Sequence, residues 1–554
     1  MSLIEQLFKI DSLSLFVGIF IGIFSLLTIV YSVGFMKRVK GLIRYYLYIV
    51  LTLLASLGAV FSNNLILFMV FWGFLGLLLY LLISFGKNER TPATAKKAFI
   101  IIGGTDALML LGLAFIWKIS QTFQIDQMSI SLNTHLAVLA YLCLAAGAFA
   151  KAGAMPFHTW VPDTAEDAPT PVTAFLPASL DKLLGIYFLV RISLDMFRMN
   201  TAMNTVLMAV GSFTIVAAVM MALIQHDLKR LLGYHAVSQV GYMVLGIGTG
   251  NPIGIAGGLF HMLNHAIYKS CLFFSCGSVE KKAGTTDLGK LGGLAKAMPI
   301  TFVTFLIASL AISGVPPFNG FASKWMVYQG IIETAKSGGY IWIVWLVAAM
   351  FGSVLTLASF MKLIHDVFLG QPSSESGVAG KVLRDVGPSM WFPQSFLALL
   401  CFIFGVFALV VPLKMFIFPS LGEEIKFFGV WNSSLATLLI IIGIIIGMVI
   451  YLLGKAAKTR EVACFIGGED LEKHPQMRVS GTEFYNTIQE LGILKGIYKL
   501  AEKKVFDIYE MGRKVTFRFN KMLGYLHNGV LPTYMAWCLL GMTIMFYILL
   551  RHIK

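Results

Sequence analysis

Long apolar segments recur along almost the whole chain and are separated by short polar loops. Because a helix needs about 20 apolar residues to cross a bilayer, the pattern predicts an all-α polytopic membrane protein with about 14 transmembrane helices. We expect the spans near residues 12–33, 42–62, 64–86, 98–118, 135–155, 171–190, 202–224, 230–249, 253–279, 299–335, 340–364, 393–413, 434–454 and 531–550. The tenth is too long for one straight helix and is expected to break at Gly314, Pro316 and Pro317.

The segment 455–530 follows a different pattern. No proline occurs between Thr482 and Asn528, and Ser480 with Glu483 forms a capping-box pattern. Apolar residues recur at helical spacing, at Phe484, Ile488, Leu491, Leu494, Tyr498, Ala501, Val505 and Tyr509. This predicts one amphipathic helix of up to about 47 residues, about 70 Å long. The helix is expected either to lie on its own bundle or on lipid, or, as its length favours, to reach across neighbouring membrane subunits.

Composition agrees with a membrane protein, since 57% of the 554 residues are hydrophobic and only 13% are charged. The net charge of +15 is spread over short loops rather than one patch, so it indicates loop topology and not nucleic-acid binding. If the loops alternate, one side collects Lys37, Arg38, Lys40, Arg44, Lys87, Arg90, Lys96, Lys97, Lys229, Arg230, Lys281, Lys282, Lys290, Lys296, Lys381 and Arg384. We expect that side to be cytoplasmic. Residues 1–11 and the C-terminal anchor 531–554 then end outside, and segment 455–530 lies on the cytoplasmic side.

The basic side includes one acidic segment, residues 162–169, with Asp163, Glu166 and Asp167. An excess of carboxylates at this position departs from the charge pattern of the other loops on that side. It suggests a cation entrance or a contact with a partner.

The chain offers no cofactor-binding motif of its own. Five cysteines fall in apolar spans, only Cys464 lies in a polar segment, and no Cys-x-x-Cys occurs, so no iron–sulfur or zinc cluster is expected. The Gly-x-Gly-x-Gly in GIGTGNPIGIAGG follows an apolar span and not a strand, which argues against a dinucleotide site. The first residues include Glu5 and Asp11 without a small-residue cleavage site, so no removable signal peptide is expected.

Lys151 lies deep in the apolar run LAAGAFAKAGAMPFHTW, five residues before Pro156. A charge at the middle of a bilayer costs about 2.5–3.5 kcal/mol on insertion scales. Pro156 cannot donate to the carbonyl of Ala152, which loosens the helix and leaves room for water. A buried lysine, unlike an arginine, can release its proton. We therefore expect Lys151 to carry protons rather than to form a static ion pair or to extend to an interface.

In FHMLNHAIYKSCLFF, the residues His261, His265 and Lys269 lie four apart and share one helix face, each about 6 Å above the last. Two histidines at this spacing could bind a metal ion, but we identify no third ligand. A proton relay fits better, because imidazole accepts on one nitrogen and donates from the other. A structural histidine pair is the remaining alternative.

Lys324 follows the expected break at Pro316 and Pro317, so a second lysine accompanies a second broken helix. Transporters are often built from inverted repeats that contain such discontinuous helices. The chain is therefore expected to hold two inverted repeats, each with its own lysine.

Three further charges lie within apolar runs: Asp106, and the adjacent Asp181 and Lys182. Neighbouring helical residues point about 100° apart. Asp181 and Lys182 thus cannot fully satisfy each other, and each is expected to meet another helix. Either carboxylate is a candidate counter-ion of Lys151.

Several stretches together closely resemble the antiporter-like membrane subunits of respiratory complex I. They are KAGAMPFHTWVPDTAEDAPTPVTAFL, HDLKRLLGYHAVSQVGYM, HMLNHAIYKSCLFFSCGSV, LGGL and PPFNGFASKW. The same family includes the Mrp-type cation/proton antiporters and the membrane-bound group 4 nickel–iron hydrogenases. The resemblance covers roughly residues 12–454, the expected antiporter-like core. The amphipathic segment with the final span looks like the lateral helix of the complex I subunit that ends the membrane arm.

The resemblance implies roles for single residues. Lys151 matches the channel lysine on a broken helix, Lys269 the lysine that links two half-channels, and Lys324 the lysine of the second half-channel. His261 and His265 match the connecting histidines. Asp106 matches an acidic residue on the helix that follows the family's essential glutamate.

The chain departs from the family at two places. The essential glutamate falls at Gly73, so Asp106 or Asp181 has replaced it as partner of Lys151, or the first half-channel works differently or not at all. The chain also starts at what looks like the family's third helix, so a separate small subunit is expected to supply the first two. SLDKLLGIY resembles the hydrogenase branch more than complex I itself.

We therefore expect a subunit that moves protons, or sodium ions, in a prokaryotic cytoplasmic (inner) membrane. Iron–sulfur clusters, with nickel–iron or flavin, are expected in membrane and peripheral partner subunits of a hydrogenase or complex I-like assembly, and no catalytic redox centre in this chain. The alternatives are a stand-alone Mrp-type antiporter driven by an ion gradient, the membrane partner of an inorganic-carbon uptake system, and a structural anchor with inactive channels.

Overall fold

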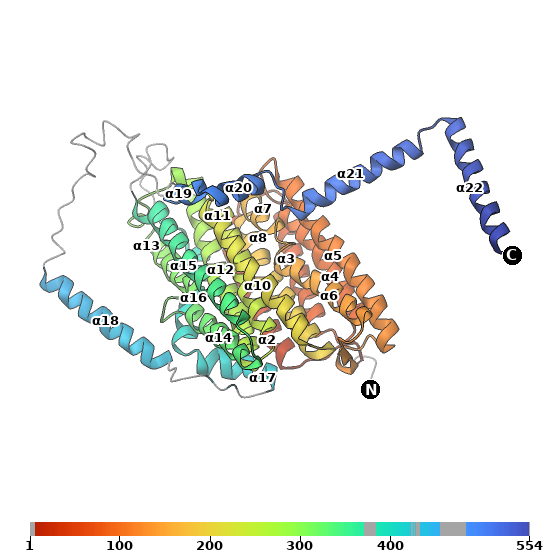
Figure 1. Ribbon diagram of the computed structural model, residues 1–554. Helices are drawn as coiled ribbons and strands as arrows, with labels where there is room; N and C mark the ends of the chain where they lie inside the picture. The colour runs from red at the N-terminus through yellow and green to blue at the C-terminus, as the bar shows by residue number, and fades with distance from the viewer. Residues whose placement is uncertain are drawn as a thin grey trace. The chain divides into compact units, whose positions relative to one another are not determined.

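The computed structural model describes residues 6–370, 384–422, 425, 427, 433–454 and 484–552. Within these ranges the protein is built from α-helices, and two strands of two residues each, β1 (Ile130–Ser131) and β2 (Phe197–Arg198), pair in parallel. The chain divides into two compact units, Met1–Leu491 and Gly492–Lys554. The first unit is a bundle of long, roughly aligned helices (Figure 1). The all-α membrane fold expected from the apolar pattern is confirmed.

The N-terminal half of the first unit begins with five long helices, whose bounds are α2 (Ser12–Phe35), α3 (Leu42–Phe61), α4 (Leu65–Ile83), α5 (Thr91–Ser120) and α6 (His135–Ala152). The short helix α7 (Trp160–Asp167) follows, and then one buried rod made of α8 (Thr170–Phe175), the π-helical turn η2 (Leu176–Leu180), α9 (Asp181–Val190) and the turn η3 (Arg191–Met196). In this half α6 packs against α5 and α9.

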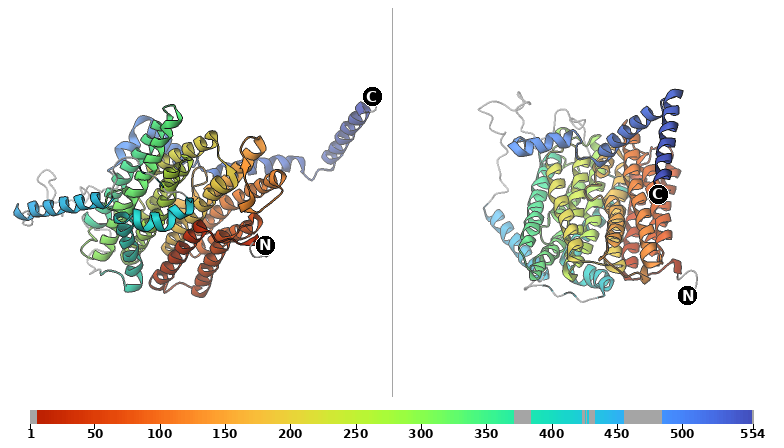
Figure 2. Two further views of the ribbon diagram at one scale, coloured as in Figure 1. Left: turned by 90° about the horizontal axis from the view of Figure 1, so that it is seen from below. Right: turned by 45° about the vertical axis from the view of Figure 1, so that its right-hand side comes forward.

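The C-terminal half of the first unit contains α10 (Thr201–Leu223), α11 (Leu228–Gly248), α12 (Pro252–Ala283), α13 (Pro299–Ser313), α14 (Asn319–Glu333) and α15 (Ile341–Ile364), which the turn η6 (His365–Leu369) extends. The unit continues with α16 (Pro388–Val406), η7 (Leu409–Ile417), α17 (Phe418–Leu421), α18 (Ser433–Leu453) and α19 (Asn486–Glu490). In Figure 2 the red and orange helices lie on one flank of the bundle and the green helices on the other, with the yellow helices α10 and α11 between them.

Ten described helices are long and apolar enough to cross a membrane. Helices α11 and α12 form where spans were predicted but are not among the ten. Every residue of α12 from Ile253 to Val279 is buried, and α12 packs against α11, α14 and α16. A helix enclosed by other helices need not present an apolar surface to lipid, which explains its polar content. The number of fourteen spans stays a prediction.

Two helices are broken in the same way. Helix α6 ends at Gly153, which has a positive φ of 77°, and the chain passes Pro156 before α7 begins. Helix α13 ends at Gly314, with a φ of 81°, and passes Pro316 and Pro317 before α14. Glycine is favoured at both ends because a side chain is strained in this backbone region. Both breaks lie where proline predicted them.

The single amphipathic helix of up to about 47 residues is wrong for the described residues. Helix α19 ends before Leu491, and the second unit has three separate helices: α20 (Gly492–Glu502), α21 (Ile508–Leu526) and α22 (Leu531–His552). Lys504 adopts a positive φ of 56°, and Asp507 caps a new helix by accepting from the Tyr509 N–H. The capping-box pair expected at Ser480 and Glu483 lies outside the described residues.

Candidate functional site

Lys151 and Asp181 form a buried ion pair between two helices. Lys151 lies in the last turn of α6, and its Nζ is 3.7 Å from Oδ1 of Asp181 in the first turn of α9. Both side chains are at most 2% exposed, and neither Lys151 Nζ nor Asp181 Oδ2 has a hydrogen-bond partner among the described residues. Paired charges without a full set of hydrogen bonds are costly to bury. The contact therefore joins α6 to α9 through two buried charges whose hydrogen bonds are incomplete within the described residues.

Asp106 was the other candidate counter-ion, and it is held differently. Its Oδ1 accepts a hydrogen bond of 3.0 Å from Nε1 of Trp72, whose ring lies 5.4 Å from Lys151 Nζ. Trp72 therefore contacts both the carboxylate of Asp106 and the ammonium of Lys151. Gly73, the position of the expected glutamate, is exposed, and a Cβ placed there would meet nothing within 4 Å. Of the two candidates, Asp181 is the one in contact with Lys151.

Lys182 turns to the broken end of α6 and not to its neighbour Asp181. A Cβ placed on Gly153 would lie 2.9 Å from Lys182 Nζ, which is also 5.8 Å from the centre of the Trp160 ring. The side chain is fully buried, and its Nζ has no hydrogen-bond partner among the described residues. As the spacing required, Asp181 and Lys182 meet different surroundings.

Lys324 reaches the end of the other broken helix. It belongs to the first turns of α14, but its Nζ donates to the carbonyl of Ile312 in the last turn of α13, at 2.8 Å. The ammonium also lies 4.9 Å from the centre of the Tyr242 ring. Since the C-terminal end of a helix is partially negative, each break places a lysine ammonium where positive charge is favoured.

His261 connects α12 to α11 and α14. Its Nδ1 is 2.9 Å from the Ser323 hydroxyl, next to Lys324 in the chain, and its Nε2 is 3.1 Å from Oε1 of Gln239. The Tyr268 hydroxyl lies 3.3 Å from the same Nε2. A histidine with partners on both nitrogens can receive a proton on one side and release it on the other.

His265 and Lys269 lie on the next two turns of α12 and are both fully buried. Neither nitrogen of His265 nor Nζ of Lys269 has a hydrogen-bond partner among the described residues. Lys269 Nζ packs 5.7 Å from the ring centres of Phe273 and Phe360. Buried polar groups that lack protein partners usually bind ordered water. Such water would connect His261, His265 and Lys269 along this face of α12.

Sequence reasoning missed four side chains that contact this row, Trp72, Gln239, Tyr242 and Ser323, and it missed His235, which packs on the same Phe360 ring as Lys269. Three of them, His235, Gln239 and Tyr242, come from HAVSQVGYM at positions i, i+4 and i+7, and so share one face of α11. A polar stripe in an interior helix was the available signal.

The carboxylates of the acidic segment, which suggested a cation entrance or a partner contact, are bonded to side chains of neighbouring helices. Lys97 Nζ lies 2.8 Å from Asp163, Arg230 binds Glu166 at 2.6 Å, and Asp167 accepts from Thr94 at 2.6 Å. Arg90 adds a second contact with Glu166 at 3.3 Å. The carboxylates of α7 are therefore paired within the chain, and they tie the second half of the broken helix to α5 and α11.

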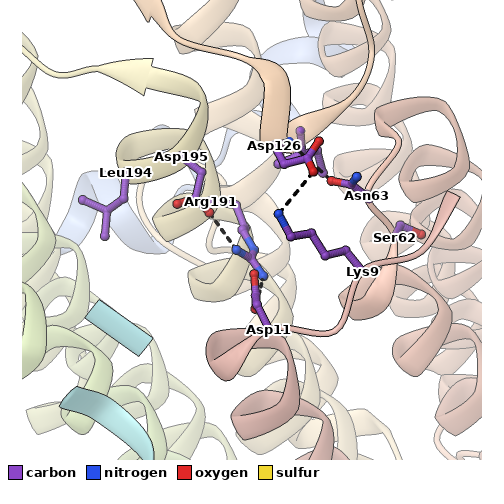
Figure 3. A pocket seen from close by; sticks show the side chains of 9 residues that line it. Lys9, Asp11, Ser62, Asn63, Asp126, Arg191, Leu194 and Asp195 are labelled. Atoms are coloured by element: carbon purple, nitrogen blue, oxygen red, sulfur yellow. Dashed lines mark hydrogen bonds and ion pairs between the residues drawn. The ribbon is translucent and has the colours of Figure 1, made fainter. Parts of the chain in front are cut away.

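The opposite end of the bundle has a cavity of about 380 Å³ lined by Lys9, Asp11, Ser62, Asn63, Ile125, Asp126, Arg191, Leu194 and Asp195. Figure 3 shows Arg191 between Asp11 and Asp195, at 2.6 and 2.7 Å, and Lys9 directed to Asp126. Arg191 Nε also donates to the hydroxyl of Tyr187, which in turn donates to the carbonyl of Val60. The described part of the chain contains no group of three or more His, Cys, Asp or Glu side chains that could hold a metal ion.

Comparison with known families gives a match over residues 62–356, more than half of the chain, to the transmembrane region described as NADH:quinone oxidoreductase/Mrp antiporter. This region contains all the buried charges described above. Among individual proteins, subunit A1 of a Na⁺/H⁺ antiporter of Staphylococcus aureus is 30% identical over 472 residues. That alignment covers 79% of this chain but only 58% of the antiporter subunit.

Two solved structures share the fold. A chain of the Mrp complex from Dietzia sp. DQ12-45-1b is 24% identical with a TM-score of 0.68, covering 74% of this chain and 83% of that one. A chain of the membrane-bound sulfane sulfur reductase, an archaeal respiratory membrane complex, is 23% identical with a TM-score of 0.82, covering 98% and 89%. The second likeness extends over nearly the whole chain.

Proposed function

Because the chain belongs to the NADH:quinone oxidoreductase/Mrp antiporter family, we propose that it moves protons, or sodium ions, across the membrane as one subunit of a multi-subunit complex. The observation that carries the proposal is the row of buried titratable side chains from Lys151 through Lys269 to Lys324. A soluble or purely structural helical bundle has no reason to retain such charges in its interior.

The row runs across four helices. It begins at the Lys151–Asp181 pair on α6 and α9, and Lys182 continues it at the broken end of α6. His265, Lys269 and His261 follow on one face of α12, whose turns are about 5.4 Å apart. The serine bonded to His261 precedes Lys324 in the chain, so the row ends at the second break.

Ion movement along this row follows from electrostatics. When one lysine gains or loses a proton, the charge that acts on the next group changes, and its proton affinity changes with it. Asp181 stands as the counter-ion of Lys151, and Gly73 supplies no carboxylate at the position of the family's glutamate. Moving one charge against 100 mV costs about 2.3 kcal/mol. In this proposal the energy comes from partner subunits that carry iron–sulfur clusters with nickel–iron or flavin.

A redox-driven complex of the hydrogenase or complex I type is our first choice of assembly. The fold likeness to the archaeal respiratory complex includes the helices after residue 454, since it covers 98% of the chain, whereas the likeness to the Mrp complex covers 74%. The second candidate is a stand-alone Na⁺/H⁺ antiporter, which the identity to the staphylococcal subunit favours. In either case we place the ion-paired end of α7, rich in loop lysines and arginines, on the cytoplasmic side.

The direct test is ion translocation by the purified complex in lipid vesicles. Lys269→Ala is expected to abolish translocation while the subunits still co-purify, because the row is cut at its centre. Lys282→Ala serves as control, since Lys282 lies at the loop end of the same helix. Translocation at the normal rate by an assembled Lys269→Ala complex would refute the proposal. Metal and flavin analysis of the co-purified subunits separates a redox-driven complex from an antiporter.

A further inference from the structure

A second row of polar side chains leads away from Lys269 along α15, and the proposed function does not use it. We propose that His235, Ser359, Lys362 and Asp366 form a proton inlet that joins Lys269 to the end of the bundle where the α7 ion pairs lie. The inference rests on the proposed function, because it gives Lys269 a supply of protons.

The inner end of the inlet is built around Phe360. The His235 ring centre lies 4.9 Å from that of Phe360, and Lys269 Nζ lies 5.7 Å from the same ring. His235 Nδ1 and Lys269 Nζ are both buried and have no hydrogen-bond partner among the described residues. Two unpartnered polar atoms beside one ring make a site at which ordered water is favoured. A water there would connect the histidine to the lysine.

The middle of the inlet runs along one face of α15. His235 Nε2 lies 2.8 Å from the Ser359 hydroxyl, so the ring has a partner on the side away from the unpartnered nitrogen. Lys362 is one turn further along α15 and Asp366 one turn beyond it, at the i+3 and i+4 spacings that place residues on one face. All three side chains of this face are buried, with Asp366 at 5% exposure.

The outer end reaches the surface at the turn η6. His365 Nδ1 lies 3.2 Å from Asp366 Oδ1, and the His365 side chain is 45% exposed. An exposed histidine in contact with a nearly buried carboxylate can pass a proton from water into the interior. The proton would go from His365 to Asp366, then to Lys362, Ser359 and His235, and each group would return to its first state as the next proton arrives.

The mouth of the inlet is covered by residues that precede α19. The Tyr485 hydroxyl donates to the carbonyl of Ala358 at 2.8 Å, and its ring lies 6.0 Å from Lys362 Nζ. The Phe484 ring centre is 5.5 Å from that of His365. Two aromatic side chains from the same short segment therefore cover Lys362 and His365. We include Tyr485 in the proposal as the residue that limits the access of water to Lys362.

Lys362 also has a structural contact, which the test must separate from proton transfer. Its Nζ donates to the carbonyls of Leu223 and Gln225, both at 3.1 Å, and so ties α15 to the end of α10. Arginine can make the same contacts but does not release its proton in a protein. Lys362→Arg therefore keeps the tie and removes the transfer step.

The experiment measures proton translocation by the purified complex in lipid vesicles, with subunit content as the check on assembly. Lys362→Met and His235→Gln are each expected to lower the translocation rate by about tenfold or more. Lys362→Arg is expected to be as slow as Lys362→Met. Lys336→Met is the control, because Lys336 is 67% exposed and paired with the neighbouring Glu333. Its rate should match that of the unaltered complex.

Three results would overturn the proposal. Full activity of Lys362→Arg would show that Lys362 acts only as a tie. Normal rates in both Lys362→Met and His235→Gln, beside an inactive Lys269→Ala, would refute the inlet and leave the proposed function intact. If Lys269→Ala is also fully active, both fail.

The cover is tested separately by labelling. A Lys362→Cys complex is treated with a hydrophilic thiol reagent, and modification at position 362 is followed by peptide mass spectrometry. The added change Tyr485→Ala is expected to speed modification several-fold. An unchanged rate would refute the role of Tyr485.

Discussion

Lys151 Nζ and Asp181 Oδ1 lie 3.7 Å apart at the junction of α6 and α9, the first helix being the one that breaks at Gly153. The pair brings together residues that are 30 positions apart in the sequence. It supplies a carboxylate to Lys151 in a chain that has glycine at position 73.

Asp181→Asn is expected to lower ion translocation about tenfold or more, which corresponds to about 1.4 kcal/mol or more in the barrier. The amide keeps the shape but not the charge that stabilises protonated Lys151. Asp106→Asn is expected to have a smaller effect, because Asp106 bonds to Trp72 and not to the lysine. Vesicle translocation rates of the two variants decide between the carboxylates, and a larger loss in Asp106→Asn would contradict this assignment.

Gly73→Glu is expected not to rescue Asp181→Asn. A side chain at this position has room, since a Cβ meets nothing within 4 Å, but it starts on the exposed face of α4. The new carboxylate therefore has no direct approach to Lys151. The double variant is compared with Asp181→Asn alone in the same translocation assay, where recovery of the rate would show that position 73 can reach the lysine.

Gly185→Ala is expected to destabilise the crossing of α6 and α9. A Cβ there would lie 2.5 Å from the backbone nitrogen of Ala152 and 2.8 Å from the carbonyl oxygen of Ala148, so the helices must separate. Overpacking of this kind costs about 1–3 kcal/mol. Thermal unfolding in detergent measures the loss. Gly103→Ala is the matched control, because its Cβ meets no atom within 4 Å, and it should leave stability unchanged or slightly higher.

Arg191→Lys is expected to lower the unfolding temperature of the complex. The guanidinium binds Asp11, Asp195 and the Tyr187 hydroxyl at once, which a single ammonium cannot do. Losing hydrogen bonds to charged groups costs about 1.5–3 kcal/mol each. Lys9→Met removes one half-exposed ion pair with Asp126 and should change little. Equal effects of the two variants would show that the arginine contacts add no stability.

Asp227 predicts a pH dependence at the ion-paired end of the bundle. Burial raises the pKa of this carboxyl above its ordinary value of 3.8, and hydrogen bonds from Thr286 and the Arg230 N–H offset part of the rise. The folded protein therefore binds a proton more tightly than the unfolded chain. The contribution of Asp227 to stability is therefore fully present below pH 3.8 and is lost as pH rises through the folded pKa.

The matched variant is Asp227→Asn, which retains the cap at the start of α11 because asparagine caps a helix as well as aspartate. It is expected to remove this contribution, so the unfolding temperature should fall less steeply with pH than in the unaltered protein. Identical slopes in the two proteins would mean that Asp227 does not titrate in this range.

The sequence by itself determined the helical membrane fold, because an apolar run of sufficient length has one stable arrangement in a bilayer. It also determined both helix breaks, since proline and a glycine that tolerates positive φ act locally, and it identified the lysines and histidines of the central row. Periodicity alone did not locate the interruption between α20 and α21. The apolar pattern continues there, but Lys504 has a positive φ and the side chain of Asp507 caps the start of a new helix.

Only the tertiary structure decided which groups meet. The choice of Asp181 over Asp106 for Lys151, the pairing of the α7 carboxylates with Lys97 and Arg230, and the meeting of His235 with Ser359 all join residues from separate helices. Spacing along one helix fixes which face a residue occupies, but the helix that covers that face is chosen by the packing of the whole bundle. The row of charges was therefore readable in the sequence, and its partners were not.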